Sequence, residues 1–220
     1  SSTIIVGANF VKKDVHKSCN FPLKKIHVVL NGISNSRLDL ANTFKGSNQV
    51  YDFLYLSGFA KHKNHKLLIN ALPRGSRACL IGQDLGQLKS VQSLINNRKH
   101  EIQVDIFDSI KNDSDLFSLI SSVRYCVFSS SYEGFGIPIL EYAALNKYII
   151  ASNIPAFIEM SDYIDEYFDV DDIDSLESLL LKLHVKTKKK SNNVSLSLYD
   201  SRYSESKIYN QLLRVLDLQL

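Results

Sequence analysis

Short apolar runs, each of a length typical of a buried strand, recur about every 24 residues through the middle of this chain. Segments with helical patterns separate them. A regular alternation of strand and helix predicts a parallel α/β sheet whose strands are joined by right-handed crossovers. The runs share a spacing but little sequence, so a repeat protein is excluded. The predicted strands are residues 53–56, 78–81, 104–107, 125–128 and 148–151.

Length and composition favour a soluble domain without a nucleic-acid partner. The 220 residues are enough for one well-buried domain with extensions, and a net charge of +3 is too small to indicate nucleic acid. The three cysteines lack metal-ligand spacing, and Cys79 and Cys126 lie in predicted strands, which favours free thiols in a reducing compartment. No signal peptide or bilayer-spanning run is evident. We expect a cytoplasmic protein, and the start at Ser1 without Met suggests an excised fragment.

A glycine-rich segment follows the fourth predicted strand. It carries Gly134 and Gly136, then Pro138 at a position suited to the start of a helix. A strand that passes through such a loop into a helix leaves backbone N–H groups unpaired, here those of Phe135, Gly136 and Ile137. With no side chain at the glycines to block an anion, the segment predicts a phosphate site.

Two carboxylates, Glu133 in the loop and Glu141 about one turn into the helix, make the prediction of a phosphate site more specific. A carboxylate beside a phosphate repels it unless the carboxylate faces a neutral group, and the hydroxyls of a sugar are such groups. The pattern therefore indicates a sugar attached to a phosphate. The alternative is that Glu133 is a solvated loop charge and Glu141 an exposed residue on an amphipathic helix.

The segment 133–141, followed by Ala143, Ala144 and residues 150–159, resembles the nucleotide-sugar-binding core of glycosyltransferase family four. The resemblance implies a GT-B fold of two Rossmann-like domains. It also implies that this chain contains the C-terminal half, an α/β Rossmann-like parallel sheet with helices on both faces. The part not included is then the N-terminal, acceptor-binding domain.

Domain organisation follows from the resemblance and from the polar stretches. We expect the end of the N-terminal domain and the interdomain connection in 1–33, a linker in 34–50, and the donor-binding domain in 51–185. A mobile basic loop in 186–203 and a C-terminal helix in 204–220 complete the chain. Attraction of the basic loop to anionic lipid, a peripheral membrane contact, is an alternative to a purely solvated loop.

The resemblance also implies roles for individual residues. Glu141 would bind the ribose hydroxyls, Glu133 would contact the donor sugar, and Lys63 would neutralise the leaving diphosphate. Backbone N–H groups from Gly134 to Ile137 would hold oxygens of the sugar and the diphosphate. Because ligands of open parallel sheets bind beyond the carboxyl ends of the strands, the donor-binding candidates are Gly58, Lys61, Gly82, Gly134, Phe135, Gly136, Ile137 and Glu141.

The chain departs from the family pattern after Gly58, where Phe59 replaces a common Arg and the loop is one residue shorter. Lys61 is a candidate to replace the lost charge, and the alternative is that Lys61 and Lys63 are ordinary solvated charges. Two Asp-x-Asp patterns, at 113–115 and 169–171, precede predicted helices. Helix capping therefore explains them better than a metal site does. A short helix that ends at Glu159 is expected beside the site.

The residues and the family resemblance together predict the donor-binding half of a metal-independent hexosyltransferase without a cofactor, and the resemblance implies that it is a retaining enzyme. It would move a sugar from a nucleotide-diphosphate sugar to a hydroxyl of a saccharide or a lipid-linked saccharide. The pathway would be bacterial surface polysaccharide or glycolipid synthesis, at the inner face of the membrane. This fragment alone is expected to be inactive. The alternatives are a non-catalytic nucleotide-sugar-binding module and a sugar-nucleotide epimerase-like protein.

Overall fold

A six-stranded parallel sheet forms the centre of the protein, in the order β5-β4-β3-β6-β7-β8. The structure is a computed structural model and describes residues 2–44, 49–185 and 202–217. All five strands predicted from the apolar runs are present, and all pairs in the sheet are parallel. The strands are β3 (Tyr51–Leu56), β4 (Arg77–Ile81), β5 (Gln103–Phe107), β6 (Val123–Phe128), β7 (Tyr148–Ser152) and β8 (Glu166–Phe168).

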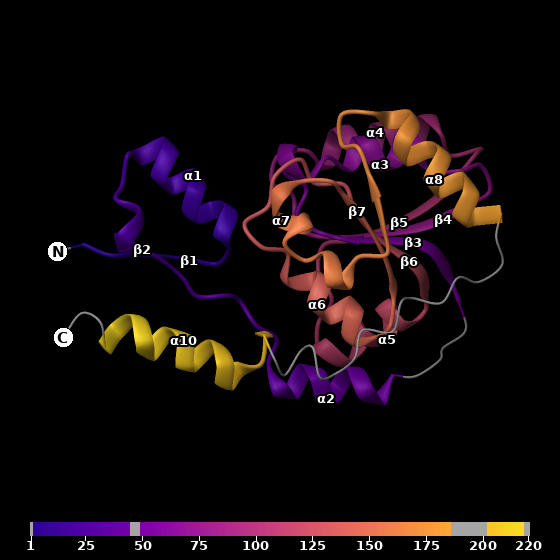
Figure 1. Cartoon of the computed structure of the whole chain (residues 1–220). Helices are drawn as coiled ribbons and strands as arrows, with labels where there is room; N and C mark the ends of the chain where they lie inside the picture. The colour runs from indigo at the N-terminus through magenta and orange to yellow at the C-terminus, as the bar shows by residue number, and fades with distance from the viewer. Residues whose placement is uncertain (1, 45–48, 186–201, 218–220) are drawn as a thin grey trace.

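Helices cover both faces of this sheet, as predicted (Figure 1). On one face α3 (His65–Ala71) packs against α4 (Leu88–Asn97) and α8 (Ile173–Val185). On the other face α2 (Asn35–Thr43) packs against α5 (Asp113–Ser121) and α6 (Ile137–Ala144). Because both faces are covered, the central strands read as nearly continuous apolar runs. The Cys79 and Cys126 thiols are buried in β4 and β6 as free thiols, and Cys19 is exposed.

Residues 34–50, which we expected to form a linker, contain helix α2, which packs against α5 and α6. The side chain of Ser34 caps the helix by accepting a hydrogen bond from the backbone N–H of Arg37. The helix has almost no apolar stripe, since Ala41 is its one fully buried residue among those described. Periodicity could therefore not reveal it, and a Ser cap without a capping-box Glu is a weak signal.

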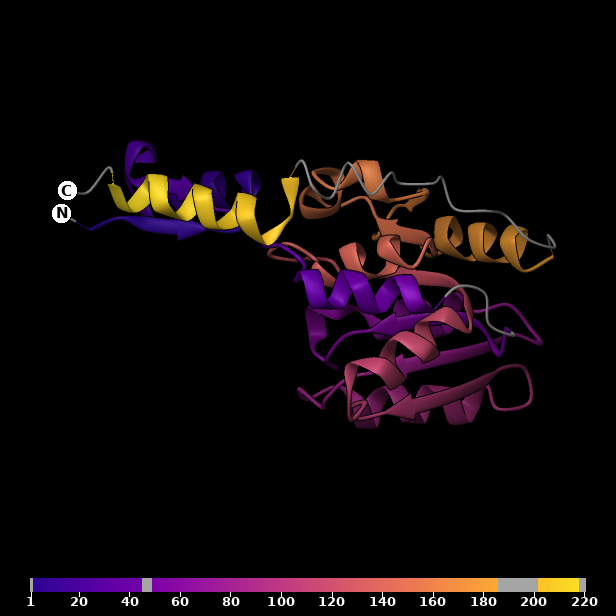
Figure 2. The same cartoon turned by 90° about the horizontal axis from the view of Figure 1, so that it is seen from below.

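The N-terminal segment forms a separate small unit (Figures 1 and 2). Strands β1 (Ile4–Val6) and β2 (Ile26–Val28) pair in parallel, and α1 (Asn9–Cys19) and the 3₁₀ turn η1 (Leu23–Lys25) connect them. The C-terminal helix α10 (Glu205–Asp217) lies alongside this unit rather than on the six-stranded sheet. The N–H of Leu30 donates to Gln211 Oε1 at 3.2 Å, and that of Ile33 donates to the carbonyl oxygen of Tyr203 at 3.3 Å.

The C-terminal helix predicted in 204–220 is present, and its apolar side chains are only partly covered. Val215 is buried, Ile208 and Leu212 are half-buried, and Leu216 is exposed. Most of the predicted basic loop, residues 186–201, lies outside the described residues. Among the helices that the structure describes, none is long and apolar enough to cross a bilayer.

The shorter elements lie mainly around the carboxyl edge of the sheet. The 3₁₀ turn η2 (Lys61–Lys63) follows β3, and α7 (Pro155–Ile158) and the 3₁₀ turn η3 (Ser161–Tyr163) follow β7. Strand β8 was not predicted, because it has only three residues. Phe168 alone among them is fully buried, so the segment shows no apolar run.

Candidate functional site

A cleft of about 480 Å³ opens between the carboxyl edge of the sheet and the N-terminal unit. The loops after β3 and β6 form one wall, and the N-terminal unit contributes residues to the other. The cleft is lined by Gly7, Val11, Asn31, Leu56, Ser57, Gly58, Lys63, Phe128, Glu133, Gly134, Phe135, Gly136, Ile137 and Pro138. Five predicted site residues of the glycine-rich loop (Glu133, Gly134, Phe135, Gly136 and Ile137) thus meet Gly58 and Lys63 in one concave site, the usual form of a ligand pocket.

The glycine-rich loop presents backbone donors to the cleft. Gly136 has a φ of 100°, in the left-handed region that favours glycine, and it leads directly into α6. The N–H groups of Phe135, Gly136 and Ile137 find no hydrogen-bond acceptor within the part of the chain that the structure describes. Free donors at the start of a helix match the geometry expected of an anion site, and their role in binding stays a prediction.

An ion pair between Lys63 and Glu133 lies at the centre of the site. Lys63 Nζ is 2.6 Å from Glu133 Oε1, and both side chains are largely buried. The Ser130 hydroxyl donates to the same carboxylate oxygen at 2.7 Å. The Tyr55 hydroxyl lies 2.6 Å from Ser130 Oγ and 3.0 Å from the carbonyl oxygen of Lys63. This network fixes Glu133 from the protein side.

Sequence reasoning missed Tyr55 and Ser130 as members of the site. Ser130 stands beside the recognised motif, but nothing in the sequence indicates where its hydroxyl points. Tyr55 reads as a core residue of β3, and its ring is indeed fully buried. Burial raises the pKa of Tyr55 well above its ordinary value, so the hydroxyl stays protonated and available as a donor.

Glu141 does not line the cleft. It faces α2, where Arg37 Nη2 lies 2.9 Å from Glu141 Oε1 and Arg37 Nη1 lies 2.6 Å from Asp113 Oδ1. Burial raises the pKa of Glu141, and the nearby charge of Arg37 opposes that increase. Arg37 is a further site residue that sequence reasoning missed, because it belongs to the unpredicted helix α2.

Two other donor-binding candidates also lie away from the cleft. A Cβ at Gly82 would collide with the carbonyl oxygen of Ser57, so this glycine permits the close approach of two loops. Lys61 lines a second cavity, formed by residues of η2, α3, α4 and the loop after β6. Phe59, at the position where the family commonly has Arg, is buried and stacks on His65 with ring centroids 4.4 Å apart. Among the described residues, Lys63 is therefore the one cationic side chain that lines the cleft.

The Asp-x-Asp patterns lie at the starts of helices, as predicted. Asp113 and Asp115 are in the first turn of α5, and Asn112 Oδ1 accepts the backbone N–H of Asp115 at 2.8 Å. Asp169 Oδ1 accepts the N–H of Asp171 at 3.0 Å in the turn before α8. In the described ranges no group of three or more His, Cys, Asp or Glu side chains is placed to hold a metal ion.

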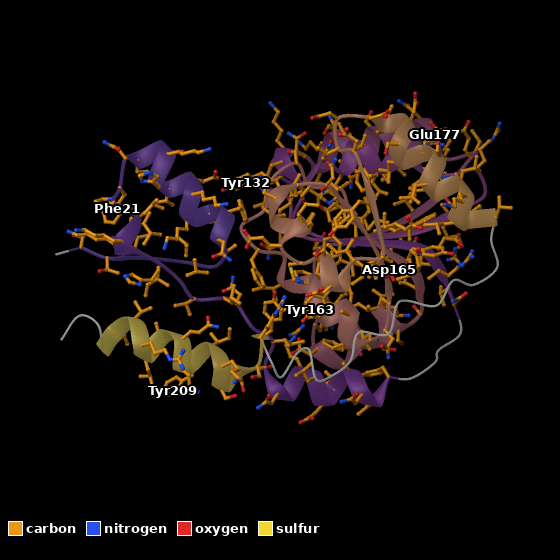
Figure 3. The ribbon with its side chains drawn as sticks, in the orientation of Figure 1. Phe21, Tyr132, Tyr163, Asp165, Glu177 and Tyr209 are labelled. Atoms are coloured by element: carbon orange, nitrogen blue, oxygen red, sulfur yellow. The ribbon has the colours of Figure 1, made fainter. Side chains whose placement is uncertain are left out.

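Glu159 and Tyr132 connect the sheet domain to the N-terminal unit. The Glu159 carboxylate accepts the backbone N–H groups of Asn9 at 3.0 Å and Phe10 at 2.6 Å, and so caps α1. Tyr132, labelled in Figure 3, lies between the loop and α1 with its ring 6.2 Å from that of Phe10. The short helix that ends before Glu159 is present as α7, and the carboxylate binds a helix terminus rather than lining the cleft.

Comparison with known proteins identifies the family. Residues 42–183 match the family described as "Glycosyl transferases group 1", and this match covers more than half of the chain. The chain belongs to this family. The fold prediction is confirmed, because the six-stranded parallel sheet has helices around it and its structural neighbours are GT-B glycosyltransferases.

The curated relatives act in O-antigen synthesis. The group 1 chain is 27% identical over 213 residues to the O-antigen biosynthesis glycosyltransferase WclY of Escherichia coli, a match that covers 88% of this chain and 58% of the relative. Over 70 residues it is 33% identical to O-antigen chain mannosyltransferase B of the same species, which covers 32% of this chain and 18% of that protein. The chain thus spans little more than half the length of its first relative.

Solved structures with the same fold include a glycosyltransferase from Rickettsia africae. Its TM-score is 0.75 at 20% identity, and the match covers 97% of this group 1 chain and 62% of that one. Anabaena Alr3699/HepE, solved in complex with UDP and glucose, gives a TM-score of 0.76 at 16% identity over 99% of this chain and 63% of that one. At these identities the likeness establishes the fold alone.

Proposed function

We propose that this chain is the donor-binding half of a retaining, metal-independent glycosyltransferase that transfers a hexose from a nucleotide-diphosphate sugar. The observation that carries the proposal is the Lys63–Glu133 pair beside the free N–H groups that begin α6, all in one cleft. The cleft combines donors for a diphosphate with a carboxylate for sugar hydroxyls. Membership of the group 1 family supports the same reaction class.

The diphosphate would bind where positive charge is concentrated. The N–H groups of Phe135, Gly136 and Ile137 would donate to its oxygens, and Lys63 would neutralise the charge that develops as the sugar departs. These contacts lower the barrier only if they strengthen in the transition state. Lys63 would thus be shared between Glu133 and the diphosphate when the donor is bound.

Glu133 would accept hydrogen bonds from the donor sugar. Its Oε1 is occupied by Lys63 and Ser130, which leaves Oε2 as the acceptor for a hydroxyl. Glu141 would bind the ribose hydroxyls, and the proposal requires that ribose to reach a carboxylate now paired with Arg37. Retention is an implication of the family resemblance, and no side chain is assigned as a general base.

The relatives suggest the pathway and the donor class. Synthesis of a bacterial surface polysaccharide is proposed because the relatives are an O-antigen biosynthesis glycosyltransferase and an O-antigen chain mannosyltransferase. A UDP-sugar is proposed first because the Anabaena protein was solved with UDP and glucose. The acceptor would be a saccharide or a lipid-linked saccharide, bound with the help of an N-terminal domain at the inner face of the membrane.

A non-catalytic nucleotide-sugar-binding module is the second candidate. The observation that favours it is Phe59, whose buried ring replaces the cationic side chain common in the family. Among the described residues that line the cleft, Lys63 is then the one cation. Such a module would bind the donor without turning it over. The two candidates therefore differ in catalysis and agree in binding.

Calorimetric titration with UDP, GDP and ADP, with and without EDTA, tests the shared part of both candidates. We expect one nucleotide to bind equally well with and without EDTA, and K63M to weaken it by about tenfold, roughly 1.4 kcal/mol. K13M, on an exposed face of α1, is the matched control and should leave binding unchanged. Failure of all three nucleotides to bind would overturn the donor site. Because this chain alone is expected to be inactive, hydrolysis of the sugar-nucleotide is then measured on a protein that also contains the N-terminal domain, and turnover there separates the enzyme from the module.

A further inference from the structure

Helix α1 begins without a cap of its own. The residue at its N-cap position is Ala8, whose side chain cannot accept a hydrogen bond, and no acidic residue lies in its first turn. Backbone N–H groups at the start of a helix need acceptors from elsewhere, and the partial positive charge there favours an anion. Figure 1 shows that α1 begins at the end of the N-terminal unit that faces α7.

Glu159, which directly follows α7, supplies the missing acceptors. Its Oε2 accepts the backbone N–H of Asn9 at 3.0 Å and the side-chain amide of Asn9 at 3.4 Å. Its Oε1 accepts the N–H of Phe10 at 2.6 Å. Within the described residues, no other hydrogen bond joins residues 2–30 to the sheet domain in 49–185. One carboxylate therefore makes the polar contact between these two parts of the protein.

Packing beside Glu159 is incomplete. A cavity of about 240 Å³ lies there, lined by residues of the N-terminal unit, the glycine-rich loop, α7 and the segment before α10. Tyr132 meets Phe10 edge to face, but the ring centroids are 6.2 Å apart and Tyr132 is half-exposed. An interface that contains a cavity lacks part of the contacts that fix two closely packed surfaces. The carboxylate therefore matters more for the position of α1 than it would in a close-packed interface.

Two neighbouring chain segments connect the N-terminal unit and α10 to the sheet domain. The N–H of Ile33 donates to the carbonyl oxygen of Tyr203 at 3.3 Å, and Ile33 forms a parallel bridge with Ser204. A Cβ at Gly32 would lie 2.5 Å from the same carbonyl oxygen, so this glycine allows the two segments to touch. Two crossings side by side allow rotation about that place. The position of the N-terminal unit therefore depends on a contact elsewhere.

We infer that Glu159 is a positioning residue that holds the N-terminal unit against the sheet domain and so fixes the second wall of the cleft. Gly7 and Val11, which line the cleft, flank the two residues whose N–H groups the carboxylate accepts. Helix α7 also lies against the glycine-rich loop, since a Cβ at Gly136 would be 3.0 Å from Phe157 Cε1. The carboxylate thus joins both walls, whatever the cleft binds.

A distance measurement between two spin labels tests the inference. Cys19 of α1 is exposed and the other two cysteines are buried, so one label attaches to Cys19 and the other to S93C on an exposed position of α4. We expect one narrow distance distribution with Glu159 present, and a distribution at least about twofold broader in E159A. E177A removes an exposed carboxylate of α8 as the matched control and should keep the narrow distribution.

E159Q and added salt show whether the charge is responsible. E159Q keeps the size of the side chain without its charge, so its distribution should lie between those of wild type and E159A. Glu159 is exposed, so about 1 M KCl should broaden the wild-type distribution and leave that of E159A unchanged. The salt measurement needs no substitution at Glu159 and therefore decides even if E159A fails to fold. A carboxylate that only caps α1 would leave the distribution narrow in E159A and in salt, and either result would overturn the inference.

Dissociation of UDP connects the inference to the proposed function, on which this one measurement rests. In stopped-flow experiments UDP should leave E159A at least about threefold faster than wild type, because the second wall of the cleft is no longer held in place. E177A should release UDP at the wild-type rate. Failure of wild type to bind UDP would count against the proposed donor site. The distance measurement is made without ligand and would still decide the role of Glu159.

Discussion

Arg37 Nη2 lies 2.9 Å from Glu141 Oε1, so helix α2 holds the second carboxylate of the glycine-rich motif. The same guanidinium contacts Asp113 at 2.6 Å and lies over the ring of Phe117, 5.1 Å from its centroid. One side chain thus joins α2, α5 and α6 on one face of the sheet. Because the Glu141 side chain is only 9% exposed, its charge depends on this partner.

Replacing Arg37 should destabilise the fold. In R37M the nearly buried Glu141 carboxylate loses its counter-charge, and we expect the free energy of unfolding to fall by about 2–3 kcal/mol, somewhat less than for a fully buried pair. Urea denaturation at pH 7.5 measures the change. R77M is the matched control, because Arg77 is half-exposed and lies 3.9 Å from Asp105, so its loss should cost roughly 0–1 kcal/mol. Equal effects of the two substitutions would contradict the importance of the Arg37 contact.

His65 should make stability depend on pH. Burial lowers its folded-state pKa to about 4, below an ordinary value near 6.5, so the unfolded state binds the proton more readily between these two values. The contribution of His65 to stability is present above about pH 6.5 and is lost as the pH falls toward 4. A shift of this size corresponds to roughly 3 kcal/mol at most.

Comparison of wild type with H65F isolates this contribution. The Phe ring suits the space between Tyr55 and Phe59 and cannot titrate. Urea unfolding between pH 4.5 and 7.5 should show a smaller loss of stability at acidic pH for H65F than for wild type. The exposed His62 supplies the control, since H62Q should keep the wild-type slope. Parallel profiles for H65F and wild type would show that His65 does not titrate as described.

Ser130 should act as a positioning residue for Glu133. Its hydroxyl donates to Glu133 Oε1, and the proposed function assigns the other oxygen of this carboxylate to the donor sugar. S130A should therefore weaken binding of a UDP-sugar by about three- to tenfold, the worth of one hydrogen bond, and leave binding of UDP unchanged. Parallel calorimetric titrations with the two ligands measure the difference. S131A is the control, because the Ser131 hydroxyl donates to the backbone of His62 instead. A loss of UDP binding in S130A would point to a general distortion of the loop.

The sheet was predictable because its strands are buried on both faces and read as apolar runs. Cys79 and Leu80, for example, are both fully buried although their side chains face opposite sides of β4. The glycine-rich loop was predictable because its special backbone requires special residues: Gly136 adopts a φ that other residues avoid, and Asn146 adopts a left-handed φ of 52° just after α6. Positions with such backbone constraints can be recognised in the sequence, because few residue types satisfy them.

The partners of the site residues were not predictable, because they depend on directions that sequence spacing does not fix. Lys61 and Lys63 are two residues apart in the same 3₁₀ turn, yet they line different cavities. Glu141 faces Arg37 because α2 packs on α6, and α2 itself gave no periodic signal. Long-range pairings of this kind follow from tertiary packing, which overrides local pattern.

The two glycines of the glycine-rich loop, Gly134 and Gly136, should respond differently to replacement by alanine. At Gly136 the positive φ strains any other residue, and a Cβ would approach Phe157 Cε1 to 3.0 Å, so G136A should lose about 1–2 kcal/mol of stability. At Gly134 an added Cβ meets nothing within 4 Å, so G134A should unfold at the wild-type urea concentration.

Replacement of Gly134, which should leave stability unchanged, should instead weaken ligand binding. The methyl group of G134A would enter the cleft that we propose for the donor, so it should weaken nucleotide binding in calorimetry although the fold is intact. The deciding comparison is between the urea midpoint and the nucleotide affinity of this one variant. A diphosphate that accepts hydrogen bonds from the N–H groups next to Gly134 leaves no room for a methyl group there. If G134A bound the nucleotide as tightly as wild type, the donor would therefore not lie against the start of α6.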